Sequence, residues 1–362
     1  MDKEFNQHWG TSLVCVLCEN CDRRYVKPQS LLITRCPNCH LEKLKTFENS
    51  EVFKPAEYHP ECYLPYVIST PRLRSILEEF TRDVPFSAHD MDCENILARK
   101  RYIFLPQWLV DTQLQARWQA EIGFDYKVMS HEDRYDDRNG GWVSRKLEET
   151  RVRWESRLGS LDRTYHNVRT AGIEDKIDPR IAKFDTSIAK TYNPLVIEEA
   201  LVCLPDLSPD DAWNSVQPVI QELAADECRN AAGGDHIRRF SWKPKFIKRN
   251  WTLILLPMIS SYYLDDSNEP QGILINGQTG QIIGRRVASM KRAQQMSIII
   301  LGIALLVFLL SLGISAASII FPLILSIGIL GLAISIVIGL CTIIPFVTVW
   351  WYNRREALKS DS

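Results

Sequence analysis

The most informative absence in this sequence is that of charge near the C-terminus. No Asp, Glu, Lys or Arg occurs between Ala293 and Asn353, although charged residues make up 24% of the 362-residue chain. As a helix, the 57 residues from Met296 to Tyr352 would be about 85 Å long, against a hydrocarbon core of about 30 Å. One span would leave half of this segment in water, and three would leave almost nothing for turns. The absence therefore predicts two transmembrane helices, near residues 296–314 and 320–348.

The ends of this segment predict its orientation. A turn is expected at Ser315–Ser318, the least hydrophobic point, with Pro322 just beyond. Because basic residues favour the cytosolic side, both termini are expected in the cytosol and the hairpin in the plasma (inner) membrane. The basic residues at the two ends are Arg285, Arg286, Lys291, Arg292, Arg354, Arg355 and Lys359. With no ionisable residue inside either span, the hairpin is interpreted as an anchor; its glycines (Gly328, Gly331, Gly339) add the hypothesis of oligomerisation.

A signal peptide and the common catalytic motifs are also lacking. Residues 1–10 are polar, and no apolar core of signal-peptide length follows them. The ten cysteines are therefore expected as reduced thiols rather than as a secreted disulfide framework. There is no Walker lysine loop, no His-Glu-x-x-His and no Gly-x-Ser-x-Gly. No catalytic residue is assigned, and an enzyme of unrecognised type is the least favoured class.

Four of the cysteines have the spacing of a metal site. Two residues separate Cys18 from Cys21 and Cys36 from Cys39, and fourteen residues lie between the pairs. Two such knuckles, brought together by a hairpin, place four thiolates around one ion, which is the closed tetrahedral geometry of structural Zn²⁺ sites. The sequence therefore predicts a zinc ribbon over residues 1–46, with strands at 12–17 and 31–34 leading into the knuckles.

Two alternatives stay open within this ribbon. Cys15 lies three residues before Cys18, so these two cysteines form a rival first knuckle. His40, directly after Cys39, is an alternative ligand. Asp22 and His40 also occupy positions where such knuckles usually carry glycine, so tighter or slightly strained turns are expected.

The stretch between ribbon and membrane predicts an α+β body over residues 47–290, followed by the membrane hairpin over 291–362. Pro71 at the first helical position, with Thr70 as cap, indicates a helix over about 71–82. Ser208, Pro209 and Asp211 are typical of a capping box at the start of a second helix, which Gly233–Gly234 ends.

A strand that contains Leu-Pro follows each helix, at Tyr102–Pro106 and at Leu253–Pro257. Residues 108–118 alternate between two faces, which is typical of a strand with one buried side. Gln271–Ile275 and Gln281–Gly284 flank Asn276–Gly280, which predicts a hairpin turn. These patterns favour a duplicated strand–helix–hairpin unit, at residues 60–125 and 195–287. Residues 140–158 predict further strands, and 172–190 a charged, partly helical insert.

One stretch, residues 238–249, combines cations and aromatic residues without any acid. This composition suits an anionic lipid layer or a nucleic acid, with an ordinary solvated strand as the alternative. Seven basic and six acidic residues make residues 1–50 nearly neutral, which disfavours phosphate binding by the ribbon. The six cations of this basic strip are Arg238, Arg239, Lys243, Lys245, Lys248 and Arg249.

With its ribbon and three short motifs, the chain resembles bacterial membrane proteins that carry an N-terminal zinc ribbon of the transcription-factor-B type. The motifs are Leu207–Trp213, Leu255–Pro257 and Ile275–Gly280. The resemblance covers most of residues 15–295 and departs from the family at the knuckle glycines. It implies no settled activity.

The sequence as a whole favours a membrane-anchored, zinc-binding adaptor that presents a protein-binding surface in the cytosol. A membrane-associated nucleic-acid-binding protein is the alternative. The expected cofactor is structural Zn²⁺, and the expected partners are the lipid bilayer and another protein.

Overall fold

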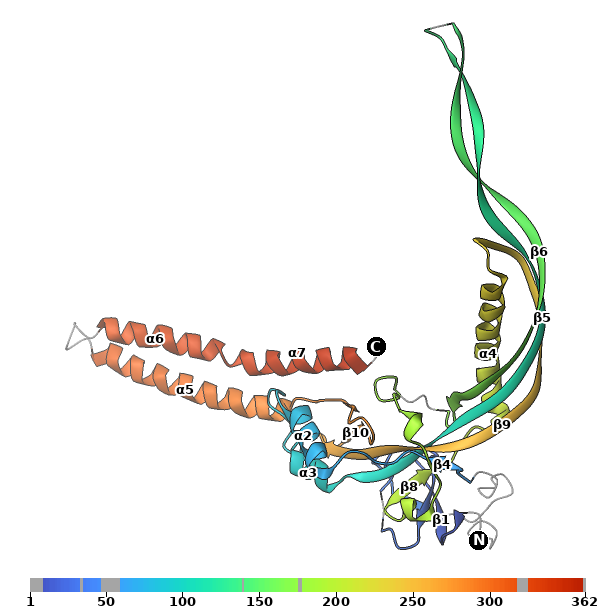
Figure 1. The fold of residues 1–362 in the computed structure, drawn as a ribbon. Helices are drawn as coiled ribbons and strands as arrows, with labels where there is room; N and C mark the ends of the chain where they lie inside the picture. Colours follow the sequence, from blue (N-terminus) through green and yellow to red (C-terminus); the bar gives the residue numbers. More distant parts are fainter. Residues whose placement is uncertain are drawn as a thin grey trace. The chain divides into compact units, whose positions relative to one another are not determined.

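The computed structural model describes residues 9–32, 35–46, 59–138, 140–174, 178–317 and 325–360 (Figure 1). Its fold is mixed α/β, with an N-terminal cysteine cluster, one sheet and two long apolar C-terminal helices. The chain divides into two compact units. Unit 1 is formed by residues 1–106, 175–204 and 255–362, and unit 2 by residues 107–174 and 205–254. The domain limits at residues 46 and 290 stay a prediction.

The described strands form a sheet whose main path is β11-β10-β9-β5-β8-β2-β1-β3. β5 and β8 pair parallel, and the other pairings with a known register are antiparallel. The strands are β1 (Leu13–Leu17), β2 (Arg24–Pro28), β3 (Lys45–Thr46), β4 (Cys62–Tyr63), β5 (Arg101–Asp136), β6 (Gly141–Ala171), β7 (Lys190–Thr191), β8 (Ala200–Cys203), β9 (His236–Leu264), β10 (Pro270–Asn276) and β11 (Ile282–Gly284).

The helices begin where the sequence places capping residues. α2 (Thr70–Thr81) has Pro71 in its first turn, but Ser69 is its cap, one residue before the predicted Thr70. α4 (Pro209–Ala232) has the predicted capping box of Ser208 and Asp211 and ends at Gly233, whose φ is 65°. α3 (Cys93–Ala98) is short, with the Asp92 side chain accepting a hydrogen bond from the Glu94 amide.

The predicted strand with one buried face is confirmed and is longer than expected. Between Val110 and Ile122 every second residue of β5 is buried. α4 covers this face in unit 2, where Trp213 and Ile220 join the same apolar cluster as Leu114. β6 pairs with β5 from Gln107–Ala171 to Asp136–Gly141, so the predicted strands after residue 140 are one long strand.

Two further expectations are corrected. Leu31 and Leu32 lie outside any strand, because the chain turns after Pro28, whose carbonyl accepts a bond from the Leu31 amide at 3.1 Å; Ile33 and Thr34 lie outside the described residues. Where a partly helical insert was expected, the described part of 172–190 holds only the 3₁₀ turn Thr186–Ile188. A second 3₁₀ turn follows at Pro194–Ile197. The duplication of a strand–helix–hairpin unit stays a prediction.

The hairpin turn at residues 276–280 is confirmed, and the side chain of its first residue, Asn276, stabilises it. Its side-chain oxygen accepts hydrogen bonds from the amides of Gln278 and Thr279 at 2.8 and 2.9 Å. Its side-chain nitrogen donates to the carbonyls of Ile181 and Lys183 at 2.8 and 3.1 Å. Asn276 is fully buried, so one side chain closes the turn and joins it to the segment before β7.

Two helices of the C-terminal region are long and apolar enough to cross a membrane: α5 (Met290–Ala317) and the span Ser326–Lys359. The second span consists of α6 (Leu325–Leu340) and α7 (Ile343–Ser360). The second span was expected as one helix, but it is interrupted at Cys341. Pro345 explains the break, because proline lacks an N–H and its ring clashes with the carbonyl four residues earlier, which is that of Cys341.

The expected turn of this hairpin is also shifted. Residues 315–317 still belong to α5, whereas Ser318 and Pro322 lie outside the described residues. Gly328 and Gly331 face α5, since a Cβ on either would lie 2.2 Å from a serine hydroxyl, that of Ser315 or Ser311. These two glycines therefore serve contact within the hairpin, and oligomerisation stays a prediction.

Candidate metal centre

Both cysteine pairs lie in tight turns built by backbone hydrogen bonds. In the first, β1 and β2 form a hairpin that ends with the pair Leu17–Arg24, and the Cys18 amide donates to the Arg23 carbonyl at 3.0 Å. In the second, the Cys36 amide donates to the Glu42 carbonyl at 2.9 Å. Each hairpin thus presents its two thiols on the inner side of one turn.

The residue after each pair has the left-handed backbone that was expected from the position. Asp22 has a φ of 53° and His40 a φ of 57°. For a residue with a Cβ this conformation costs about 1–2 kcal/mol relative to glycine. The turns therefore keep the geometry of a glycine-containing knuckle, at some local strain.

The four sulfur atoms converge. The Sγ atoms of Cys18, Cys21, Cys36 and Cys39 all lie within 4.8 Å of one another. Across the two knuckles, Cys18 Sγ lies 3.5 Å from Cys39 Sγ, and Cys21 Sγ lies 3.7 Å from Cys36 Sγ. Four ligands at the Zn–S distance of about 2.3 Å would be separated by about 3.8 Å in a regular tetrahedron. The cysteines are thus close enough to hold a metal ion.

Among the four cysteines, the surroundings of Cys39 favour its thiolate form. Burial opposes ionisation of Cys39, but hydrogen bonds from the backbone amides of Glu42 and Leu41 outweigh it and lower the pKa of this thiol to about 7. Burial raises the pKa of Cys36, although the Asn38 amide donates to its sulfur at 3.4 Å. Binding of a metal would hold both as thiolates, the form in which cysteine is a ligand.

The two alternative ligands have other surroundings. Cys15 lies on β1, is 2% exposed and packs in an apolar cluster with Trp9 and Val26. Burial raises the pKa of this thiol to about 11. The imidazole of His40 stacks on Tyr262 with ring centroids 4.9 Å apart, and burial lowers its pKa to about 4.

Two residues of β9 that support the second knuckle were missed by sequence reasoning. The Ser260 hydroxyl donates to the Pro37 carbonyl at 2.5 Å and lies 3.4 Å from His40 Nε2. The Tyr262 hydroxyl accepts a hydrogen bond from Arg35 at 2.9 Å. The only sequence signal was the polar pair Ser260–Ser261, which follows the apolar second half of β9 from Leu253 to Ile259, and it did not indicate a partner more than 200 residues away.

The basic strip at residues 238–249 lies in the first half of β9, within unit 2. Arg238 and Arg239 both pair with Glu121, at 2.6 and 2.8 Å. Arg238 also lies over the ring of Trp154, 3.8 Å from its centroid. These two cations therefore have partners within the protein.

The rest of the strip is mixed. Arg249 lies 4.9 Å from the ring centroid of Trp213 and 3.8 Å from an Asp210 oxygen. Over the described part of the chain, Lys243, Lys245 and Lys248 form no salt bridge. Contact of the strip with lipid or nucleic acid stays a prediction.

Comparisons with known proteins add no relative. No family model matches the chain, and neither a curated protein nor a solved structure is similar to it. The resemblance to the bacterial zinc-ribbon membrane proteins therefore stays a prediction that rests on its short motifs.

Proposed function

We propose that this chain is a membrane-anchored zinc-binding protein that acts as an adaptor for a protein partner on the cytosolic side. The observation that carries the metal part is the convergence of four cysteine sulfurs within 4.8 Å. Zinc is the ion that suits four thiolates in a tetrahedral shell. Four protein ligands leave no position for water, so the ion would hold the two knuckles together rather than catalyse hydrolysis.

Metal content of purified variants tests this part. The detergent-solubilised full chain is expected to carry one zinc per chain by elemental mass spectrometry, and Cys18→Ser or Cys39→Ser is expected to remove it. Cys15→Ser is the matched control, because Cys15 lies in an apolar cluster, and it should retain the metal. Zinc loss in Cys15→Ser with retention in Cys21→Ser would instead assign Cys15 and Cys18 to the first knuckle.

The anchoring part is supported by the two apolar spans and by the cations at their ends. Arg285, Arg286 and Arg354 flank the charge-free segment in the sequence, and positive residues favour the cytosolic side of a membrane. We therefore place both ends of the hairpin in the cytosol of a plasma (inner) membrane. Protease digestion of inside-out and right-side-out vesicles tests the orientation: the C-terminus should be cut only in inside-out vesicles.

The adaptor part is supported by the end of the β5–β6 hairpin, residues 126–151, here called the arm tip. β9 begins beside Gly123, since the Asp235 amide donates to the Gly123 carbonyl at 3.0 Å. Beyond that point the register pairs β5 with β6 alone, past the end of α4 in unit 2 (Figure 1). Among the residues that the structure describes, no third strand pairs with the arm tip, so both of its outer strand edges can accept a strand of another protein.

Exposed apolar side chains on the arm tip fit this role. Trp142 is 73% exposed and Met129 63% exposed, and Trp142 packs edge-on against Tyr135 with ring centroids 5.5 Å apart. A two-stranded ribbon is only marginally stable in water, and large exposed apolar residues on such a ribbon favour a protein partner.

Affinity capture tests the adaptor idea. The detergent-solubilised full chain should recover one stoichiometric protein, and Trp142→Ser should abolish that recovery. Leu195→Ser is the control, because Leu195 is 67% exposed but lies in unit 1. Equal recovery with both variants would refute the arm tip as the binding site, and recovery of nucleic acid alone would refute the adaptor role.

Nucleic-acid binding remains the second candidate, and the lysines of the basic strip are the observation that favours it. Lys243 and Lys245 line a shallow hollow together with Arg117. The neighbouring arginines oppose it, because Arg238 and Arg239 already pair with Glu121, which neutralises one of their two charges. Salt-dependent retention on DNA or RNA that is lost in Lys243→Gln/Lys245→Gln would favour this candidate over the adaptor.

A further inference from the structure

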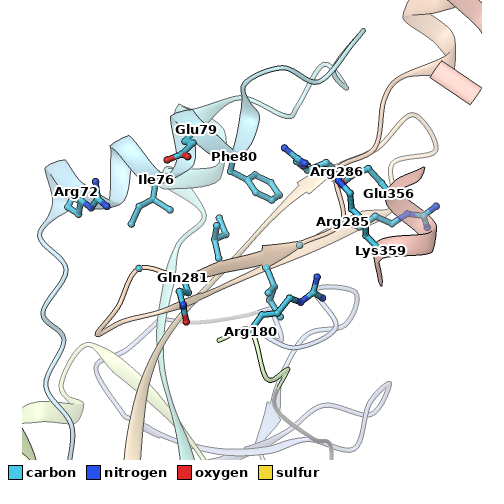
Figure 2. Close-up of a pocket in the computed structure, with 14 residues that line it drawn as sticks. Arg72, Ile76, Glu79, Phe80, Arg180, Gln281, Arg285, Arg286, Glu356 and Lys359 are labelled. Carbon is cyan, nitrogen blue, oxygen red and sulfur yellow. Dashed lines mark hydrogen bonds and ion pairs between the residues drawn. The ribbon is translucent and has the colours of Figure 1, made fainter. Parts of the chain in front are cut away.

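A cleft of about 590 Å³ lies in unit 1 between α2, β11 and the last turns of α7 (Figure 2). Its floor is apolar and includes Ile76 and Phe80. Its charged lining is predominantly basic: Arg72, Arg180, Arg285, Arg286 and Lys359 against Glu79 and Glu356. Figure 2 shows these cations coming from separate elements of the chain.

Part of this charge is already neutralised. Glu356, only 8% exposed, accepts from Arg286 at 3.3 Å and from Lys359 at 2.7 Å. Arg180 pairs with Asp178 at 2.6 Å.

Arg72 and Arg285 differ from the other cations of the cleft. Within the described ranges, neither forms a salt bridge, and both are exposed. Each of these two guanidinium groups is thus available to an anion that enters from solvent or from the membrane surface.

The cleft lies at the level where the chain enters the apolar hairpin. The Ala288 amide donates to Asn353 Oδ1 at 2.8 Å, and Asn353 Nδ2 donates back to the Ala288 carbonyl at 3.0 Å. This pair of hydrogen bonds joins the start of the first span to the end of the second. Arg285 and Glu356 lie three residues outside it, so their side chains are expected at the depth of lipid headgroups once the uncharged residues occupy the hydrocarbon.

We propose that this cleft binds a phosphate group, supplied in the membrane by the headgroup of an anionic phospholipid. The proposal rests on the membrane anchoring proposed above. A guanidinium group offers a planar pair of donors that matches two phosphate oxygens. Basic pockets beside membrane helices on the cytosolic side are typical headgroup sites. The volume of the cleft lies in the range of small-ligand sites, which is about 300–1,000 Å³.

The test uses the full chain in a neutral detergent and native mass spectrometry of added lipid. Phosphatidylglycerol should bind, and phosphatidylcholine should bind at least about tenfold more weakly. A basic residue that contacts an anionic headgroup contributes about fivefold to its binding, so Arg72→Gln/Arg285→Gln should weaken phosphatidylglycerol binding about thirtyfold. Arg292→Gln/Arg354→Gln removes the same charge at the same boundary but outside the cleft, and it should change binding by less than about threefold.

Two further measurements complete the lipid-binding experiment. Glycerol phosphate that binds with the same dependence on Arg72 and Arg285 would keep the phosphate site but assign it to a soluble ligand. An equal loss in the two double variants, or no preference for phosphatidylglycerol, would overturn the proposal. If the glutamine variant does not fold, Arg72→Lys/Arg285→Lys keeps the charge without the paired donors, and unchanged binding by it would overturn the bidentate role.

Failure of the anchor gives a different result. Release of the wild-type chain from membranes by alkaline carbonate would refute the anchoring, whatever its phosphate binding. An inserted wild-type chain without lipid preference would refute the cleft proposal alone.

Discussion

Replacing Asn276 tests whether one buried side chain stabilises the α+β body close to residues 285–288, here called the membrane linker, which lead into α5. Asn276→Ala removes two hydrogen bonds to amides of its own turn and two to the carbonyls of Ile181 and Lys183. Lys183 and the turn amides lie where water can reach them, but Ile181 is fully buried. One unsatisfied buried carbonyl costs about 1–3 kcal/mol, and each lost bond about 0.5–1.5 kcal/mol. We expect a loss of at least about 3 kcal/mol in the free energy of unfolding.

The assay is thermal unfolding of the full chain in detergent, followed by tryptophan fluorescence. At about 2–4 °C per kcal/mol for a body of this size, Tm should fall by at least about 6 °C. Gln278→Ala is the control: its amide group exchanges hydrogen bonds with the Asp185 backbone at 2.7 and 3.0 Å, but in an exposed place, so Tm should fall by less than about 3 °C. Equal shifts for the two variants would refute the reasoning.

Three other outcomes follow from particular contacts. The Arg99 guanidinium and a β9 amide outweigh burial and lower the pKa of Asp90; its stabilisation is therefore present above about pH 4 and lost as the pH falls through the depressed pKa. Asp90→Asn should accordingly lower Tm at pH 7, and this difference from the wild type should shrink progressively as the pH falls below about 4. Gly331→Val should lower Tm, because the added Cβ would lie 2.2 Å from a serine hydroxyl on α5. Gly339→Val is the control and should leave Tm unchanged, since nothing lies within 4 Å of its Cβ. Equal Tm values for the two variants would contradict the close packing of α6 on α5. Replacing residues 130–147 by Asn-Gly, with Met129 and Glu148 still paired, should leave Tm within about 2 °C but abolish partner capture; a large drop would show that the arm tip supports the fold.

Local patterns in the sequence were sufficient for the elements that depend on local chemistry. The capping box of α4, the turn around Asn276 and the alternation along β5 are each written within a dozen residues and each is confirmed. The spacing of the cysteines was sufficient for the cluster in the same way, because two residues between thiols fix the shape of a knuckle.

What the sequence did not predict depends on contacts between distant segments. β2 was missed because Tyr25 and Val26 gain their burial from β8, whose partners Cys203 and Val202 lie about 180 residues later. The break between α6 and α7 could have been predicted from Pro345, but the length of the apolar run concealed it. The support of the second knuckle by Ser260 and Tyr262 of β9 had one local signal, the polar pair Ser260–Ser261, and that signal did not indicate the distant partner.

One strand connects the two features on which the proposed function rests. Ser260 and Tyr262 of β9 contact the second knuckle. The next residue, Tyr263, accepts a hydrogen bond from the Val287 amide at 2.8 Å and donates to the Arg285 carbonyl at 2.7 Å. The membrane linker and the cysteine cluster are therefore held by adjacent positions of the same strand. Side chains alternate between the two faces of a strand. The knuckle therefore contacts one face of β9 and the linker contacts the other, so displacement of the knuckle would disturb the strand that holds the linker. Loss of the metal should accordingly raise hydrogen exchange in β9 and in residues 285–288 together, ahead of any change in α4, whose contacts lie in unit 2.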